Sequence, residues 1–416
     1  MGRLLGDLSL LTDFELVKRD MPLEKNAKMG SIITLYKKIC AHSGNGSKFG
    51  NLSDGTKFGL CNYFYSNGNT DEALRLLDEV IKRQPNNPKP LLCRALIEES
   101  AGHDEEAIAS YDAAIRTCSG NLAAWYQKGC LLAKLSRRGE AIECFDEALD
   151  RNGRHALSWY NKGLLLFEQS PGTAILCFEK AILASPSHMP SLYNKGLACE
   201  QLERFEESLS SYESVLRMLP THLPSLYHRG IVLSKTGCGD SAIASFDSAL
   251  AVNPNHIPSL FAKGLLLSEM TRRKEAIECF DRLLEMDCDH LQALYNKGLA
   301  LESIGLIEDA MLCYDRIIYL DQDYGNILCQ KGRLLSSVGR NTEAIGYFDR
   351  ALVQNPSNAN AIFYRSCAIL KEGSSEESLK ALESMITTDP RYKDILRSEI
   401  GPKGLRADNG IMRLVN

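Results

Sequence analysis

The sequence lacks several features that would assign it to a familiar functional class. None of its 14 cysteines forms a C-x-x-C pair, so neither a zinc site nor a thioredoxin-like redox motif is supported. No apolar run approaches the roughly 20 residues that a membrane-spanning helix needs. Asp7, Asp13 and Glu15 interrupt the N-terminal segment, so we expect it not to act as a secretory signal. Ser-His-Asp, HExxH, G-x-S-x-G and dinucleotide-binding motifs are also missing. We expect a protein that is not an enzyme and needs no metal or cofactor.

The chain also lacks an excess of positive charge. Its 48 Lys and Arg residues against 53 Asp and Glu residues give a net charge of −5, which argues weakly against a nucleic-acid binder. The acidic excess lies within residues 54–392, whereas residues 1–53 carry 8 basic and 5 acidic residues and could fold back onto it. The many unpaired cysteines favour a reducing compartment, and we expect the protein in the cytoplasm, away from membranes.

What the sequence does contain is a repeat of 34 residues. The string EAIECFDEAL at 140–149 recurs as EAIECFDRLL at 275–284 and as EAIGYFDRAL at 343–352, and YNKG occurs three times. Alignment of these strings gives ten repeats over residues 54–392, of which nine have 34 residues and one, 156–188, has 33. A repeat of this length indicates an array of small helical or mixed units that bury their apolar faces by stacking.

Each repeat is predicted to form two helices. Seven repeats carry a glycine within the first helix, in the same register: Gly129, Gly163, Gly196, Gly230, Gly264, Gly298 and Gly332. Since a glycine inside a helix costs about 1 kcal/mol relative to alanine, close contact with the second helix is the natural explanation. The second helix carries a small residue and, four positions later, a large one, as in Ala174 and Phe178, which places both on one face.

This pattern resembles the tetratricopeptide repeat (TPR) family. One repeat reproduces the family motif with Trp159, Gly163, Ala174, Phe178, Ala181 and Pro186. The resemblance implies an all-α fold, a right-handed α-solenoid of about ten helix–turn–helix units with terminal capping helices. Residues 1–53 are predicted to form an N-terminal helical cap and a glycine-rich connector. Residues 54–392 form the ten TPR units, and residues 393–416 form a C-terminal capping helix followed by a loose tail from residue 401.

The resemblance also implies that the first helices line a concave channel that binds a protein or peptide. Asparagine amides can hold an extended peptide backbone, because they offer both a donor and an acceptor, and tyrosine supplies a rigid amphipathic surface beside them. The alternative is that these groups only stabilise neighbouring repeats. The candidate peptide-binding residues stand at the fifth and sixth positions of successive repeats: Gln127, Tyr160, Asn161, Tyr193, Asn194, Tyr227, His228, Tyr295, Asn296 and Gln330.

The ninth position of the first helix, which also faces the channel in this family, is mostly apolar from Leu96 to Leu299. Such a stripe suits an amphipathic helix or a hydrophobic peptide better than an acidic tail. The lysine of the family's carboxylate clamp is missing from every repeat, which disfavours a chaperone adaptor. We therefore expect a non-catalytic protein-interaction scaffold. The alternative is a structural subunit of a larger assembly, or a homo-oligomer, that uses its convex face or its ends.

Five histidines end successive repeats: His155, His188, His222, His256 and His290. One repeat separates each from the next, which is too far for them to share a metal ion, since metal–nitrogen bonds are about 2 Å long. The favoured interpretation is that each histidine helps to start the next helix, and contact with a bound peptide is the second. The arginine-rich turns at Arg137 and Arg272 are expected to be solvated.

Overall fold

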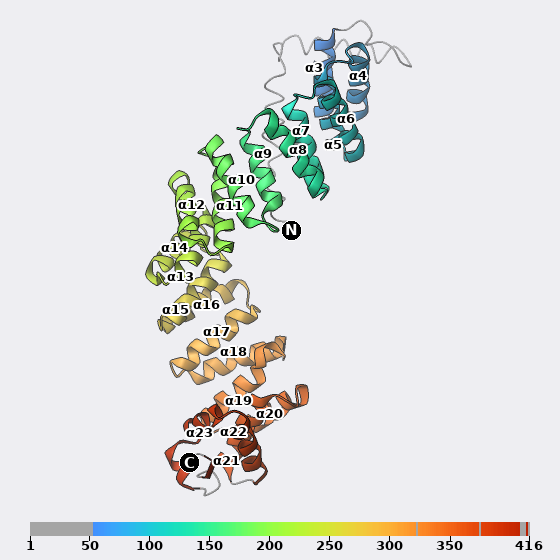
Figure 1. The fold of residues 1–416 in the computed structure, drawn as a ribbon. Coiled ribbons are helices and arrows are strands. Elements are labelled where there is room, and N and C mark those ends of the chain that lie inside the picture. The colour runs from blue at the N-terminus through green and yellow to red at the C-terminus, as the bar shows by residue number, and fades with distance from the viewer. Residues whose placement is uncertain (1–52, 322, 374–375, 408–412, 415–416) are drawn as a thin grey trace. The chain divides into compact units, whose positions relative to one another are not determined.

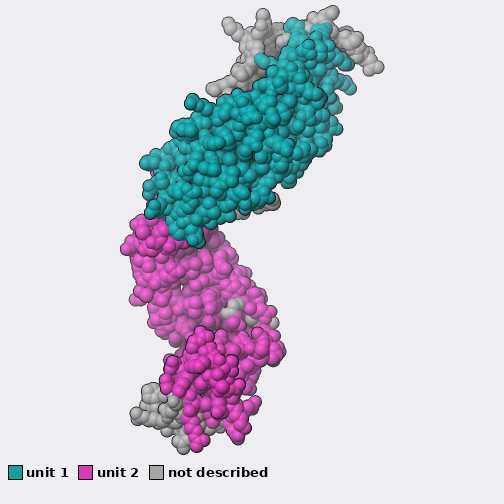
Figure 2. Space-filling model, in the orientation of Figure 1, with its two compact units in different colours: residues 1–218 teal, residues 219–416 magenta. Residues whose placement is uncertain are grey.

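The computed structural model describes residues 53–321, 323–373, 376–407 and 413–414, and over these residues the regular structure is helical throughout (Figure 1). The predicted N-terminal cap and connector lie outside the described residues except for Ser53. Helices follow one another in pairs, each joined by a short turn, which confirms the predicted all-α array of helix–turn–helix units. The chain divides into two compact units, residues 1–218 and residues 219–416 (Figure 2).

The first compact unit contains five described helix pairs. They are α3 (Asp54–Ser66) with α4 (Thr70–Arg83), α5 (Pro88–Ser100) with α6 (Asp104–Thr117), α7 (Leu122–Lys134) with α8 (Arg138–Arg151), α9 (Ala156–Leu166) with α10 (Pro171–Ala184), and α11 (Met189–Gln201) with α12 (Phe205–Met218).

The second compact unit contains five further pairs and a last helix. They are α13 (Leu223–Lys235) with α14 (Gly239–Val252), α15 (Ile257–Glu269) with α16 (Arg273–Met286), α17 (Leu291–Ser303) with α18 (Ile307–Leu320), α19 (Ile327–Ser337) with α20 (Asn341–Gln354), and α21 (Ala359–Glu372) with α22 (Glu376–Thr388), followed by α23 (Arg391–Ala407). A 3-10 turn, η1 (Tyr324–Asn326), precedes α19.

Within a pair, the two helices approach most closely where the first one carries its glycine. A Cβ atom on Gly196 would lie 2.5 Å from Cε1 of Tyr212, whose side chain is fully buried. Because carbon atoms in contact normally lie about 3.5–4.0 Å apart, only glycine fits without a shift of the ring. The predicted close contact is thus confirmed, and it recurs at Gly129–Phe145, Gly163–Phe178, Gly230–Phe246, Gly264–Phe280, Gly298–Tyr314 and Gly332–Phe348.

Consecutive pairs are joined by ion pairs that sequence reasoning did not anticipate. The basic residue just before the glycine, such as the lysine of YNKG, meets an acidic residue 16 positions earlier, on the second helix of the preceding pair. Nζ of Lys128 lies 2.6 Å from Asp112, and Nζ of Lys263 lies 2.5 Å from Asp247. The sequence contains a signal for these ion pairs: the lysine recurs in the first helix, and an acidic residue recurs directly after the aromatic residue of the second helix. Further pairs of this kind are Arg94–Asp78, Lys162–Asp146, Lys195–Glu179, Lys297–Asp281, Lys331–Asp315 and Arg365–Asp349.

The histidines at the repeat ends are the N-caps of the following first helices. Nδ1 of His188 accepts the backbone N–H of Ser191 at 3.3 Å, which satisfies one of the free donors at the start of α11. The same ring lies edge-on to Tyr160 of the preceding pair, with ring centroids 5.0 Å apart. This confirms the interpretation of these histidines as helix starters. The equivalent cap bonds are made by His155, His222 and His290, and Nδ1 of His256 lies 2.7 Å from Oγ of Ser259.

The last helix, α23, covers the end of the final pair. Leu396 is fully buried against Phe363 of α21 and Leu382 of α22. The helix continues through Gly401 and Pro402 to Ala407, so the predicted loose tail is partly helical. Glycine and proline favour a helix end, because proline lacks an N–H and glycine has the greater backbone entropy. The helix nevertheless continues past Gly401 and Pro402, and the buried Leu396 fixes it to the final pair.

Candidate functional site

The first helices of consecutive pairs line one side of each compact unit. In the second compact unit α13 contacts α15 and α15 contacts α17. We call this side the first-helix face. Each second helix packs on its own first helix in the same glycine–ring register, so the second helices form the other side, the second-helix face. The candidate residues predicted from the sequence all belong to first helices.

In the first compact unit, the candidate amides are buried between neighbouring pairs. Asn161 and Asn194 are each 5% exposed. Nδ2 of Asn161 donates to the Tyr126 hydroxyl at 3.2 Å, and Nδ2 of Asn194 donates to the Tyr160 hydroxyl at 3.5 Å and to the Pro190 carbonyl at 2.8 Å. Gln127 is also buried. These contacts favour the alternative that the sequence left open, in which the amides stabilise neighbouring repeats.

One of these amide groups has a buried oxygen without a hydrogen-bond donor. Oδ1 of Asn194 is buried and accepts no hydrogen bond, although both hydrogens of its Nδ2 have partners. A buried acceptor without a donor is unfavourable by about 1–3 kcal/mol. Tyr193 stands beside it in the chain, half-buried against the ring of Tyr212. Burial raises the pKa of Tyr193 to about 12, so its hydroxyl remains protonated at neutral pH.

In the second compact unit, the candidate side chains are half-buried rather than enclosed. Nδ2 of Asn296 donates to the Gln292 carbonyl of its own helix at 2.8 Å. Nε2 of Gln330 donates to the Tyr295 hydroxyl at 3.3 Å. His228 lies edge-on to Tyr227, with ring centroids 5.1 Å apart. Part of each polar side chain therefore reaches the surface of the first-helix face.

Several apolar ninth positions are accessible on the first-helix face. Ile231 and Leu265 are half-buried, and Leu299 is 36% exposed, on three consecutive first helices. Leu164 and Leu197 are half-buried at the same register of the first compact unit, whereas Cys130 is buried. An accessible apolar stripe beside amide and imidazole groups can bind a polypeptide through apolar contacts and backbone hydrogen bonds.

The described residues were searched for metal ligands, reactive thiols and membrane-spanning helices. No cluster of three or more His, Cys, Asp or Glu side chains suited to a metal ion occurs among them. Burial raises the pKa of Cys144 to about 11, so this thiol is protonated at neutral pH and is a poor nucleophile. No helix in the described ranges combines the length and the apolar composition required to cross a bilayer.

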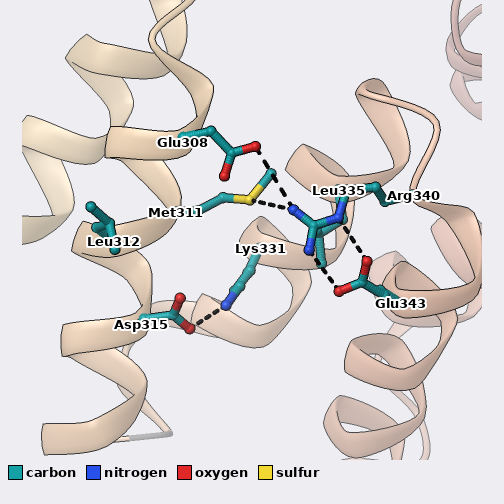
Figure 3. Close-up of a pocket in the computed structure, with 8 residues that line it drawn as sticks. All are labelled: Glu308, Met311, Leu312, Asp315, Lys331, Leu335, Arg340 and Glu343. Atoms are coloured by element: carbon teal, nitrogen blue, oxygen red, sulfur yellow. Dashed lines mark hydrogen bonds and ion pairs between the residues drawn. The ribbon is translucent and has the colours of Figure 1, made fainter.

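The arginines of the inter-helix turns are ion-paired rather than simply solvated. Arg340, in the turn before α20, bonds Glu343 of α20 at 2.7 Å and approaches Glu308 of the preceding pair at 3.8 Å (Figure 3). They line a cavity of about 330 Å³, in which Lys331 is likewise paired, with Asp315. Arg137 and Arg272 make the same two kinds of ion pair, so the turns join neighbouring pairs, which the sequence did not predict.

Comparison with known proteins supports this description of the array. A sequence profile described as "Tetratricopeptide repeat" matches residues 58–121, 126–172, 261–324 and 329–392, and a second profile of the same description matches residues 190–222. Together they cover more than half of the chain. No curated protein matches it.

Several solved structures are similar in fold. The C-terminal part of a TPR repeat-containing protein from Cytophaga hutchinsonii covers 57% of this chain and 98% of its own, at 16% identity and a TM-score of 0.51. A tetratricopeptide repeat protein from Parabacteroides merdae covers 60% of this chain and 98% of its own, at 16% identity and a TM-score of 0.41. YrrB, described as a TPR protein with an unusual peptide-binding site, covers 45% of this chain and 97% of its own, at 22% identity and a TM-score of 0.42.

TPR proteins are typically non-catalytic scaffolds, and their repeats indicate protein partners. The family's sequence profiles match more than half of this chain, and its helix pairs pack through a recurring glycine–ring contact. The chain therefore belongs to the tetratricopeptide repeat family.

Proposed function

We propose that this protein is a non-catalytic scaffold that binds an extended peptide or an amphipathic helix on its first-helix face. The observation that carries the proposal is the accessible apolar stripe of Ile231, Leu265 and Leu299 on consecutive first helices. Apolar side chains of a ligand would pack on this stripe. His228 and Asn296, half-buried beside it, would bond the ligand backbone, with Tyr227 and Tyr295 as apolar supports.

The candidate residues of the first compact unit take a secondary place in this proposal. Asn161 and Gln127 are buried, and Asn161 would contribute by holding Tyr126 of the preceding pair in position. Asn194 is different, because its Oδ1 could accept an N–H from a bound peptide backbone after a small side-chain rotation. Gln330, bonded to Tyr295 and Arg333, would form the C-terminal edge of the site.

We propose a cytoplasmic location for the protein. All 13 cysteines in the described ranges are free thiols, which suits a reducing compartment. Membership of the tetratricopeptide repeat family, whose proteins are typically non-catalytic scaffolds, supports a role without catalysis.

The test compares two double variants of the whole chain. Leu265→Gln with Leu299→Gln removes apolar surface from the first-helix face. Leu306→Gln with Val338→Gln removes similar surface from two exposed inter-helix turns and is the matched control. All four residues are partly or largely exposed, so we expect both variants to retain the helical circular dichroism of the unmodified protein.

Partners are captured from native lysate and identified by mass spectrometry. Loss of a partner in the stripe variant alone, with restored binding in Leu265→Met with Leu299→Met, supports the first-helix face. Identical partners for the unmodified chain and both variants would contradict it. They would favour the alternative, a structural subunit or homo-oligomer that uses the second-helix face or the ends, and light scattering at several concentrations would then measure self-association.

A further inference from the structure

The second-helix face carries an apolar patch at one helix of the first compact unit, α10. Leu176 is 58% exposed and Leu183 is 84% exposed. They occupy the sixth and thirteenth positions of α10, which point away from its first helix. At the same two positions α8 carries Glu143 and Asp150, both exposed. The fold therefore tolerates charge at these positions, and packing within the array does not require the two leucines.

Helix α10 is also the helix with the atypical connection. The repeat that contains it is one residue shorter than the others, α9 ends early at Leu166, and α10 starts at Pro171 after a turn without glycine. Each of its two charged residues has a partner in the array. Glu179 pairs with Lys195, and Nζ of Lys180 lies 4.1 Å from the ring centroid of Trp159 on α9. Lys180 is exposed and stands between the two leucines along the helix, so the outward surface of α10 carries two large apolar side chains and one cation that lies over the Trp159 ring.

The second helices before and after α10 carry exposed acidic side chains. Glu143 and Asp150 on α8 and Glu206 and Glu213 on α12 are all exposed, and none of them forms an ion pair within the described ranges. Since α8, α10 and α12 are consecutive second helices, they belong to the second-helix face of the first compact unit. The exposed cations of these three helices are Lys180 of α10 and Arg217, near the end of α12, which donates to Ser214.

We propose that α10 is a second docking site, separate from the first-helix face, for an amphipathic helix whose apolar stripe is flanked by Lys or Arg on both sides. Two exposed leucines on α10, with exposed carboxylates on the second helices before and after it, are complementary to that arrangement in hydrophobicity and charge. Leu176 and Leu183 are seven residues apart, or about 10.5 Å along the helix axis. Ligand side chains at positions i and i+7 would match this spacing.

The test uses a synthetic, fluorescently labelled peptide of about 18 residues, or five helical turns, with leucine on one face and lysine elsewhere. Its binding to the whole chain is followed by fluorescence anisotropy. A scrambled peptide of the same composition, without an apolar face, controls for net charge. The main variant is Leu176→Glu with Leu183→Asp, the residue types that α8 carries at the same positions.

We expect at least tenfold weaker binding by this variant, with unchanged circular dichroism. The variant adds two negative charges, so a purely electrostatic attraction for the cationic peptide would become stronger, and equal or tighter binding would overturn the proposal. Glu143→Gln with Glu213→Gln should also weaken binding and reduce its salt dependence, because four flanking carboxylates become two.

A matched variant, Leu312→Glu with Tyr319→Glu, removes exposed apolar residues from the same positions of α18. It should leave the affinity unchanged, and loss in this variant alone would overturn the assignment to α10. Equal affinity for the scrambled peptide would also overturn it. A dimer of the unmodified chain that dissociates in the α10 variant, seen by light scattering, would instead make the occupant a second copy of the chain and refute the proposed partner chemistry.

Discussion

The substitution of alanine for glycine should have opposite effects at two positions of the second compact unit. Gly230 of α13 faces the fully buried ring of Phe246, and a Cβ atom there would lie 2.5 Å from Cε1, 2.8 Å from Cδ1 and 2.9 Å from Cζ. Gly346, in the middle of α20, is exposed and has nothing within 4 Å of an added Cβ. Both glycines are helical, so the intrinsic preference for alanine is the same.

The magnitudes follow from two opposing contributions. Alanine in a helix is favoured over glycine by about 1 kcal/mol. Overpacking of a buried site costs typically about 1–3 kcal/mol, and contact with three atoms of a rigid ring places Gly230 at the upper end. We therefore expect Gly230→Ala to lower the free energy of unfolding by about 1–2 kcal/mol after the gain in helix preference. Gly346→Ala should raise it by about 0.5–1 kcal/mol.

The assay is urea unfolding followed by circular dichroism. Repeat arrays unfold in parts, so hydrogen exchange is needed to show that the change is centred on α13 and α14 in the first variant and on α20 in the second. If Gly230→Ala stabilised the protein as much as Gly346→Ala, the glycine–ring contact would not determine the spacing of the helices, and the argument would be refuted.

Three further substitutions test other contacts between helices. Burial lowers the pKa of the His222 cap, so below the ordinary histidine pKa of about 6.5 the unfolded chain binds more protons. The free energy of unfolding, measured in urea titrations, should therefore be highest above that pH and decrease as the pH falls below it, and it should decrease less in His222→Asn, which caps without titrating. Asp247→Asn removes the half-exposed pair with Lys263 and should cost less than about 1 kcal/mol, an effect that high salt abolishes in the same titration. Tyr111→Phe leaves the buried Glu99 carboxylate without a donor and should lower the free energy of unfolding by about 1–3 kcal/mol, whereas no change would imply a replacement partner.

Much of the fold was predictable because its signals are local. The glycine, the small residue and the ring recur within each repeat, and helical spacing of three and four residues assigns them to facing sides of one pair. The histidine before each first helix stands in the N-cap position, where an acceptor is needed. The prediction that the last helix ends before residue 401 was wrong. Helix propensity favours an end at Gly401 and Pro402, but the buried Leu396 anchors a helix that continues to Ala407.

The candidate site was less predictable. The alternation of tyrosine and asparagine on first helices identifies one surface, but the period alone does not reveal whether an amide faces a ligand or the next pair. Asn161 and Asn194 point into the contact with the preceding pair, and Asn296 bonds its own helix. Their role in binding stays a prediction, and the accessible leucines of the ninth positions now carry most of it.

The sequence by itself determined the helical class, the pairing of helices within each repeat and the family, because these depend on residues a few positions apart in one chain segment. Tertiary structure decided which basic residues meet acids 16 positions away, which amides are enclosed, and that Leu176 and Leu183 stand exposed between acidic helices. Those outcomes depend on the rotation and spacing of neighbouring pairs. They arise from the packing of many side chains at once. A repeated motif gives the type of residue at each position but does not determine which neighbouring surface that residue contacts.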